Sequence, residues 1–320
     1  MELFRDVNID WLGKKWYFLA FSLIFSVAGV LSLLFWHHLP LDVDFRGGTQ
    51  VRVRFDHQPD INKIRQAADR AGLRDSHITT FNSVNSATGN EVLISLPQRD
   101  TQEISLDAGR ALILKALETN YPENTAEVRS VEIVGPQVGA ALRNQALLAT
   151  GYSLAGMLVY LWFRFELIYG VAAVVAVFHD TLITVGAFSL TNQEISLTVI
   201  AAILTLIGYS MNDTIVVFDR IRENLKISRR EGLADVVNRS INQTLSRTVL
   251  TSGLTFLTVL SLYFFGGEVL HPFSFALVVG ILIGTYSSIA VAAPMLVAYQ
   301  QWRASRGRVA SLPAAKRSRA

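Results

Sequence analysis

The sequence predicts a polytopic α-helical membrane protein with six transmembrane helices and a folded α+β domain between the first and second helix. Hydrophobic residues make up 51% of the 320 residues, charged residues make up only 17%, and the mean hydropathy is +0.34. A typical soluble domain has roughly 25% charged residues. Several apolar stretches reach the length of about 20 residues that crosses a hydrocarbon core. Between the first and second stretches the charge density returns to that of a soluble domain.

The expected membrane spans are residues 16–36, 141–163, 167–190, 195–218, 242–266 and 272–299. The first is uncharged from Trp16 to Trp36, longer than the apolar region of about 7 to 15 residues in a cleaved signal, which favours a retained anchor. The third span contains His179 and Asp180, and the fourth contains Asp213. Because the flanking residues are too apolar for a loop, we expect these three ionisable side chains inside the membrane.

The basic residues predict the orientation of the chain. With the N-terminus in the cytoplasm, 17 Lys and Arg residues lie on the cytoplasmic side, and the two short loops on the other side contain none. Such an asymmetry is typical of membrane proteins. We therefore expect an N-terminal segment 1–15, a loop 219–241 and a basic tail 300–320 in the cytoplasm, with residues 41–140 exported.

The exported segment has the composition of a folded domain, with 12 basic and 14 acidic residues between positions 41 and 143. Its pattern predicts a strand at 49–55, a helix at 61–71, strands at 77–84 and 91–96, a helix at 101–120 and a strand at 126–134. This β-α-β-β-α-β order is the ferredoxin-like arrangement. The segment contains no catalytic constellation, so we expect it to bind or move a partner.

Two glycine-rich joints connect this domain to the membrane, DFRGGT where the chain leaves and VGPQVG where it returns. One interpretation is structural, because paired glycines permit positive φ and proline fixes the angle of the following helix. The other makes the joints a hinge, and the sequence leaves both open. The candidate hinge residues are Arg46, Gly47, Gly48, Gly135, Pro136 and Gly139.

A polar cluster in the fourth and fifth spans predicts proton transfer. Tyr209 and Ser210 precede Asp213 at helical spacings of four and three, so they share its face. Arg247 opens the fifth span, and Thr251 follows one turn later. A buried carboxylate near a guanidinium can take and release protons. The alternatives are an ion pair that only fixes helix packing, and an ordinary basic residue at a span end.

His179 and Asp180 lie near the middle of the third span, where ionisable groups are costly and usually functional. A histidine beside a carboxylate can relay protons. Adjacent helix residues point about 100° apart, however, and need not share a path, so a packing role stays open. Asn212, next to Asp213, completes the candidate proton-relay set.

Other reaction classes find no support in the sequence. The chain has no cysteine, no G-x-x-x-x-G-K-[ST] phosphate loop and no G-x-S-x-G elbow, and its six histidines lack metal-ligand spacing. We therefore expect no enzymatic activity, no metal and no bound cofactor, with protons as the coupling ion and no nucleic-acid partner. Any work must draw on a gradient or a partner.

Together these motifs resemble the SecF family, the smaller membrane subunits of the bacterial SecDF translocation complex in the resistance-nodulation-division superfamily. The resemblance covers positions 7 to 299. It is carried by DFRGGT, VGPQVG, the HD pair of the third span, GYSMNDTIVVFDRIREN at 208–224 and SRTVLTSGLT at the start of the fifth span. The 17-residue block at 208–224 is its most specific part, and the exported segment of about 100 residues fits SecF better than SecD.

The resemblance implies a partner and a function. SecF subunits pair with SecD in a 12-span assembly of the bacterial inner membrane, which uses proton flow to assist protein export through the SecYEG channel. On matching positions, Asp213 would be the proton-accepting carboxylate and Arg247 its partner, while a translocating polypeptide would be the substrate. Two alternatives are half of a proton-coupled small-molecule or lipid exporter of the same superfamily, and a non-transporting assembly scaffold.

Overall fold

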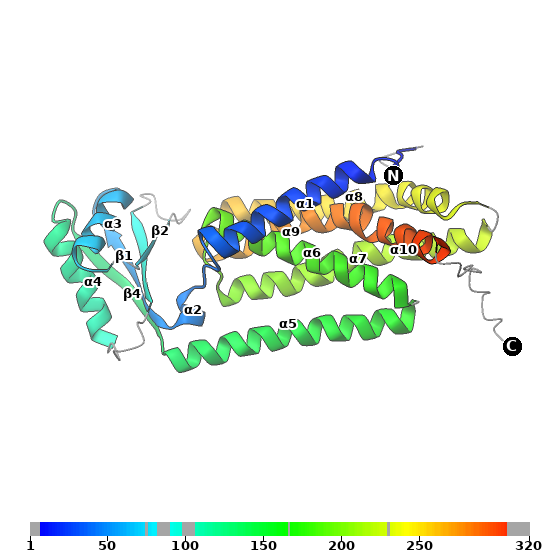
Figure 1. Ribbon diagram of the computed structural model, residues 1–320. Helices are drawn as coiled ribbons and strands as arrows, with labels where there is room; N and C mark the ends of the chain where they lie inside the picture. The colour runs from blue at the N-terminus through cyan, green and yellow to red at the C-terminus, as the bar shows by residue number, and fades with distance from the viewer. Residues whose placement is uncertain are drawn as a thin grey trace.

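The computed structural model describes residues 7–73, 76–81, 90–97, 106–165, 167–228 and 231–305. It is elongated, with a small α/β domain at one end of a bundle of long helices (Figure 1). We call that end of the bundle the domain end. We call the opposite end, where α1 begins and α10 ends, the terminal end.

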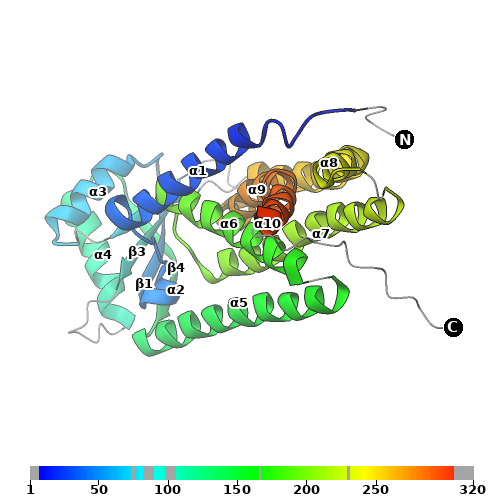
Figure 2. The same ribbon diagram turned by 45° about the vertical axis from the view of Figure 1, so that its right-hand side comes forward.

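Within the described ranges, six helices are long and apolar enough to cross a membrane, which confirms the predicted class. They are α1 (Lys15–Leu31, continued by the π-helical turn Ser32–Trp36), α5 (Pro136–Arg164), α6 (Leu167–Thr191), α7 (Leu197–Ile227), α8 (Leu233–Phe265) and α9 (Gly267–Ser287, continued through the π-helical segment Ser288–Ala292 into α10, Ala293–Ser305). Both views show α1 and α5 running along the outside of the bundle (Figures 1 and 2). Of the most apolar 18-residue stretch of α5, only 6% is buried inside the bundle.

The structure makes most of the expected cytoplasmic loop 219–241 helical. Helix α7 continues to Ile227 and α8 begins at Leu233. Hydropathy ends a span where charges begin, but a helix continues wherever its own side chains can pack. Here the two extensions pack together, with Ile221 fully buried and the Asn224 amide donating to Ser240 Oγ at 2.8 Å.

Helix α9 contacts α6, α7 and α8. Small residues permit this close packing. A methyl group at Gly280 would lie 2.5 Å from the Leu206 side chain, and one at Gly284 would lie 3.0 Å from Ser210 Cβ. The glycine ridge of α9 therefore brings its backbone against α7, the helix that carries Asp213.

The α/β domain has the predicted β-α-β-β-α-β order. Its elements are β1 (Gly48–Phe55), α3 (Ile61–Arg70), β2 (His77–Phe81), β3 (Glu91–Pro97), α4 (Leu106–Asn120) and β4 (Ala126–Val134). The sheet is antiparallel in the order β2-β3-β1-β4, and α3 and α4 pack on its buried face. Residues 82–84 and 101–105, at the ends of an expected strand and helix, lie outside the described residues.

Candidate functional site

Asp213 lies in the middle of the bundle with only 2% of its surface exposed. Ser252 of α8 donates a hydrogen bond of 2.6 Å to its Oδ2 atom. Thr285 of α9 also lies beside the carboxylate, and its hydroxyl has no hydrogen-bond partner among the described residues. Three helices therefore converge on this acid, and the small hydroxyl side chains let them approach closely.

Asp180 of α6 is equally buried, at 1% exposure, and it accepts two short hydrogen bonds on Oδ2. Ser210 of α7 donates at 2.6 Å and Ser287 of α9 donates at 2.7 Å. The other oxygen, Oδ1, lies 3.0 Å from His179 Nδ1. His179 and Asp180 therefore contact each other, a contact that their adjacent positions on the helix did not settle.

The two carboxylates are linked through α7. Ser210, which binds Asp180, lies one helical turn from Asp213, so both acids occupy neighbouring levels of the same interior. Four polar atoms of this interior have no protein partner among the described residues. They are His179 Nε2, Tyr209 Oη, Thr248 Oγ1 and Thr285 Oγ1. Buried polar groups without a protein partner commonly bind water. Such an interior has the groups that a proton path needs.

Arg247, Thr251 and Asn212 lie on the outer surface of the bundle rather than in this interior. Arg247 is close enough for its charge to act on Asp213, but these two side chains do not form an ion pair within 4.0 Å. The Thr251 hydroxyl donates to the carbonyl of Arg247 at 3.0 Å, and Thr255 in turn donates to the carbonyl of Thr251. Arg247, Thr251 and Thr255 therefore form an outward polar stripe on α8, in which Arg247 and Thr251 are exposed and Thr255 is half-buried.

Sequence reasoning missed the donors Ser252 and Ser287 and the neighbouring hydroxyl of Thr285. Each is a small polar residue inside an apolar span, and that placement is the available signal. Pairing Ser252 with Asp213 required the packing of α8 against α7, and pairing Ser287 with Asp180 required the packing of α9 against α6, which no local pattern provides.

The two joints pack against each other. Gly47 has φ 74° and ψ 155°, and a methyl group there would lie 2.9 Å from Pro136 Cα. A methyl group at Gly139 would lie 3.0 Å from the Gly47 nitrogen and 3.1 Å from backbone atoms of Phe45. These contacts explain why glycine is needed at both positions. A hinge at the joints stays a prediction.

The other candidate hinge residues have simpler roles. Gly48 also has positive φ, at 145°, where β1 begins. Gly135 precedes Pro136, the first residue of α5, and has ordinary extended geometry. Arg46 ends the short helix α2 (Val43–Arg46) and donates to the carbonyl of Leu39 at 3.3 Å.

Two carboxyl groups outside the spans are unusual. Burial raises the pKa of Asp42 to about 6, opposed by the Val43 N–H that binds its carboxylate and reinforced by neighbouring acids. Burial also raises the pKa of Glu194 to about 8, and Asp42 adds to the effect while Arg46 opposes it. No sequence pattern indicated this pair, because the two residues are 152 positions apart.

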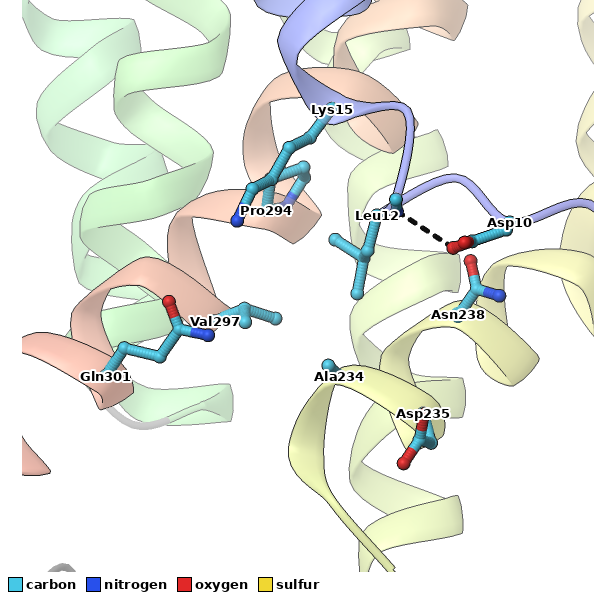
Figure 3. Close-up of a pocket in the computed structure, with 10 residues that line it drawn as sticks. Asp10, Leu12, Lys15, Ala234, Asp235, Asn238, Pro294, Val297 and Gln301 are labelled. Carbon is cyan, nitrogen blue, oxygen red and sulfur yellow. Dashed lines mark hydrogen bonds between the residues drawn. The ribbon is translucent and has the colours of Figure 1, made fainter.

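A cavity of about 240 Å³ lies at the terminal end, between the segment before α1, the start of α8 and α10 (Figure 3). Asn238 and Asn242 hold that N-terminal segment by accepting the backbone N–H groups of Trp11 and Ile9. The cavity lining includes none of the predicted proton-relay residues. Among the described residues, no three His, Asp or Glu side chains come together to hold a metal ion.

Comparison with known proteins finds similarity to the SecD/SecF proteins of protein export. The family described as "Protein export membrane protein SecD/SecF, C-terminal" matches residues 113–302. The protein translocase subunit SecF of Koribacter versatilis is 56% identical, with 98% of this chain and 96% of that protein covered. SecF of Calditerrivibrio nitroreducens is 46% identical, with 92% and 96% covered.

Solved structures agree with the sequence relatives. SecDF from Thermus, described as a translocon-associated membrane protein, superposes with a TM-score of 0.80 at 38% identity. A SecDF structure in a super-membrane-facing form superposes with a TM-score of 0.68, also at 38% identity. The alignments cover 92% and 95% of this chain, but only 39% and 40% of the SecDF chains.

Proposed function

Since this chain belongs to the SecF family of protein translocase subunits, with a role in protein export, we propose that it couples proton flow across the membrane to movement of its α/β domain. The observation that carries the proposal is the pair of buried carboxylates, Asp180 and Asp213, each bound by hydroxyl groups of facing helices. Ionisable groups at this depth are costly and are usually kept for function.

A proton gradient is a sufficient energy source. Moving one elementary charge down a potential of 100 mV supplies about 2.3 kcal/mol. Several transfers therefore exceed the few kcal/mol that separate two positions of a domain. The sequence carries no phosphate-loop motif for nucleotide binding, so protons serve as the coupling ion.

The basic residues orient the protein. The described basic residues at the helix ends of the terminal end include Lys14, Lys15, Arg164 and Lys226, and this end faces the cytoplasm of a bacterial inner membrane. Both termini are then cytoplasmic and the α/β domain is periplasmic. Asp180, bound to Ser210, lies roughly one helical turn closer to the periplasm than Asp213.

The proton path follows this order. A proton from the periplasm reaches the level of His179 and Asp180, passes to Asp213, and leaves toward the cytoplasm. Ser210 and Tyr209 line the step between the two acids, and Arg247 acts on Asp213 from the side. Protonation removes the charge that binds the serine hydroxyls, so helix positions change with each transfer. The joints pass this change to the α/β domain.

A SecD subunit covers the outward polar stripe of α8. Arg247, Thr251, Thr255 and Thr258 lie on one side of this helix, in a span of which only 17% of the most apolar window is buried. An arginine exposed to lipid is costly, so a protein partner is expected there. The SecDF relatives contain more than twice the length of this chain, enough for such a second half. The assembled pair acts on a polypeptide passing through SecYEG.

Proton flux through the reconstituted complex tests the proposal. Asp213→Asn keeps the shape of the side chain and removes its titration, so flux is expected to fall to the level of empty vesicles. Asp219→Asn is the matched control. It makes the same change on the same helix, at a partly exposed ion pair with Arg164, and it is expected to leave flux unchanged. Equal flux in the wild type and Asp213→Asn would refute the proposal.

A further inference from the structure

The segment that leads from α1 into the α/β domain is fastened to the loop between α6 and α7. The Asp42 N–H donates to the Ile195 carbonyl at 3.1 Å, and the Ile195 N–H donates to the Pro40 carbonyl at 2.7 Å. These bonds flank a parallel β-bridge between Leu41 and Ile195. We call residues 40–44 and 195–197 together the clasp.

Asp44 extends the clasp to the first residue of α7. Its Oδ2 atom accepts the backbone N–H of Leu197 at 3.1 Å, one of the N–H groups at a helix start that have no partner within the helix. Ser196, which precedes the helix, makes no such side-chain bond and pairs only with Thr198. The start of α7 is therefore held by a residue 153 positions away in the chain.

The clasp joins the parts that the proposed function must connect. On one side, its loop links α6, which carries Asp180, to α7, which carries Asp213. On the other side, Asp44 belongs to α2, which leads through Gly47 directly into the central strand β1. Figure 1 shows this connection between the bundle and the domain.

Helix α7 is suited to transmit movement along its length. It is one α-helix from Leu197 to Ile227, so Asp213 lies roughly 24 Å from the clasp at 1.5 Å per residue. At its start it is held by backbone hydrogen bonds, by the Asp44 carboxylate and by the buried side chain of Ile195, which is 3% exposed. A shift of α7 at the level of Asp213 therefore moves the clasp with it.

We propose that the clasp is the coupling element that carries movements of α6 and α7 to the α/β domain, with Asp44 as its positioning residue. The inference rests on the proposed function, because that function supplies the movement of α7. We therefore expect that, without the contact between Asp44 and Leu197, protonation of Asp213 no longer moves the α/β domain. The domain and the helix bundle should both stay folded.

The test measures domain position in a double-mutant cycle in the full complex. The chain has no cysteine, so Arg70→Cys on α3 and Phe264→Cys at the domain end of α8 can carry a pair of distance labels. Asp213→Asn, which mimics the protonated acid, is introduced alone and together with changes at Asp44. Asp44→Ala removes the acceptor, and Asp44→Asn keeps one.

We expect Asp213→Asn to change the distance between the labels in the wild-type and Asp44→Asn backgrounds, but not in the Asp44→Ala background. Ser196→Ala, in the same loop, is the control and is expected to behave as the wild type. A full response to Asp213→Asn in the Asp44→Ala background overturns the inference alone. No response in the wild type overturns the proposed function, and the inference with it.

Amide hydrogen exchange checks the contact itself without reference to protons. Asp44→Ala is expected to speed exchange at Leu197 by about tenfold, as for the loss of one hydrogen bond, with little change at the middle of α7. This result also shows that the variant is folded. Unchanged exchange at Leu197 would mean that Asp44 does not hold the helix, and it would overturn the inference.

Discussion

Ser252 of α8 donates a 2.6 Å hydrogen bond to the Asp213 carboxylate of α7, and both residues are buried. The bond joins two neighbouring helices through an ionisable group. Its strength depends on the charge of the acid, because hydrogen bonds to charged groups are roughly twice as strong as those between neutral groups. A proton on Asp213 therefore changes how tightly α7 and α8 are joined.

Removing the serine hydroxyl is expected to destabilise the protein. Ser252→Ala leaves a buried carboxylate with one donor fewer, which costs about 1 to 3 kcal/mol. Thermal unfolding of the detergent-solubilised protein measures the loss. Ser261→Ala, at an exposed position of the same helix, is expected to be neutral. Equal effects of the two substitutions would show that the bond to Asp213 contributes nothing specific.

Gly47 and Gly135, in the two joints, are expected to differ sharply in how well they tolerate substitution by alanine. At Gly47, φ 74° and ψ 155° form a backbone conformation that is almost restricted to glycine, and a methyl group would contact Pro136 at 2.9 Å. Gly47→Ala should therefore cost about 1 to 3 kcal/mol of stability. Gly135→Ala, at φ −67° and with no atom within 4 Å of the new methyl group, should be near neutral. Similar unfolding temperatures for the two variants would contradict this account.

The outward stripe of α8 is expected to become protected when the partner binds. Thr255→Cys introduces the sole cysteine of the chain, and a thiol reagent should modify it readily in the isolated protein. A SecD subunit should slow that reaction. Tyr17→Cys on α1, where the native side chain is 80% exposed, is expected to react equally in both states. Unchanged reactivity at position 255 would place the SecD interface elsewhere.

The clasp is expected to weaken as the pH rises. Asp42 and Glu194 have pKa values of about 6 and about 8, raised from 3.8 and 4.5. The folded joint therefore holds protons that the unfolded chain releases. The resulting stability is fully present below the unfolded values and is lost as the pH rises through 6 and then 8. The charged groups that act on these two carboxyls are Asp44, Glu132 and Arg46.

Hydrogen exchange at the Ile195 amide measures this loss. After correction for the intrinsic rate, its protection should fall progressively as the pH rises from the unfolded values of 3.8 and 4.5, more gently above about 6, where only Glu194 still holds an extra proton, and should level off above about 8. In Glu194→Gln, which cannot ionise at position 194, the fall comes from Asp42 alone and should end near pH 6. Protection that stays constant, or that rises with pH, would contradict the assignment.

Much of the fold was predictable because its signals are local. The span lengths and the alternation in TQVRVRF predict a six-helix protein with a β-α-β-β-α-β domain, as observed. Helices α7 and α8 extend into the predicted loop 219–241, because charges mark the membrane boundary but not the end of a helix. Asp180 and Asp213 stand out in the sequence since each interrupts an apolar run.

Other parts of the site depend on distant contacts. The pairing of Ser287 with Asp180 requires α9 to pack against α6 and α7, and no spacing in the sequence encodes it. The same holds for Asp44, which binds a helix 153 residues away. Arg247 was expected beside Asp213; it lies on the outer surface of the bundle, close enough for its charge to act on that acid.

The most direct test of the central claim is export of a polypeptide by energised vesicles that contain the complete translocation complex. With a proton gradient imposed, the wild type and Asp219→Asn should complete export at the same rate. Asp213→Asn should run at the rate that the wild type shows without a gradient, because its acid no longer carries a proton. Acceleration of Asp213→Asn by the gradient, to the same extent as the wild type, would contradict the account.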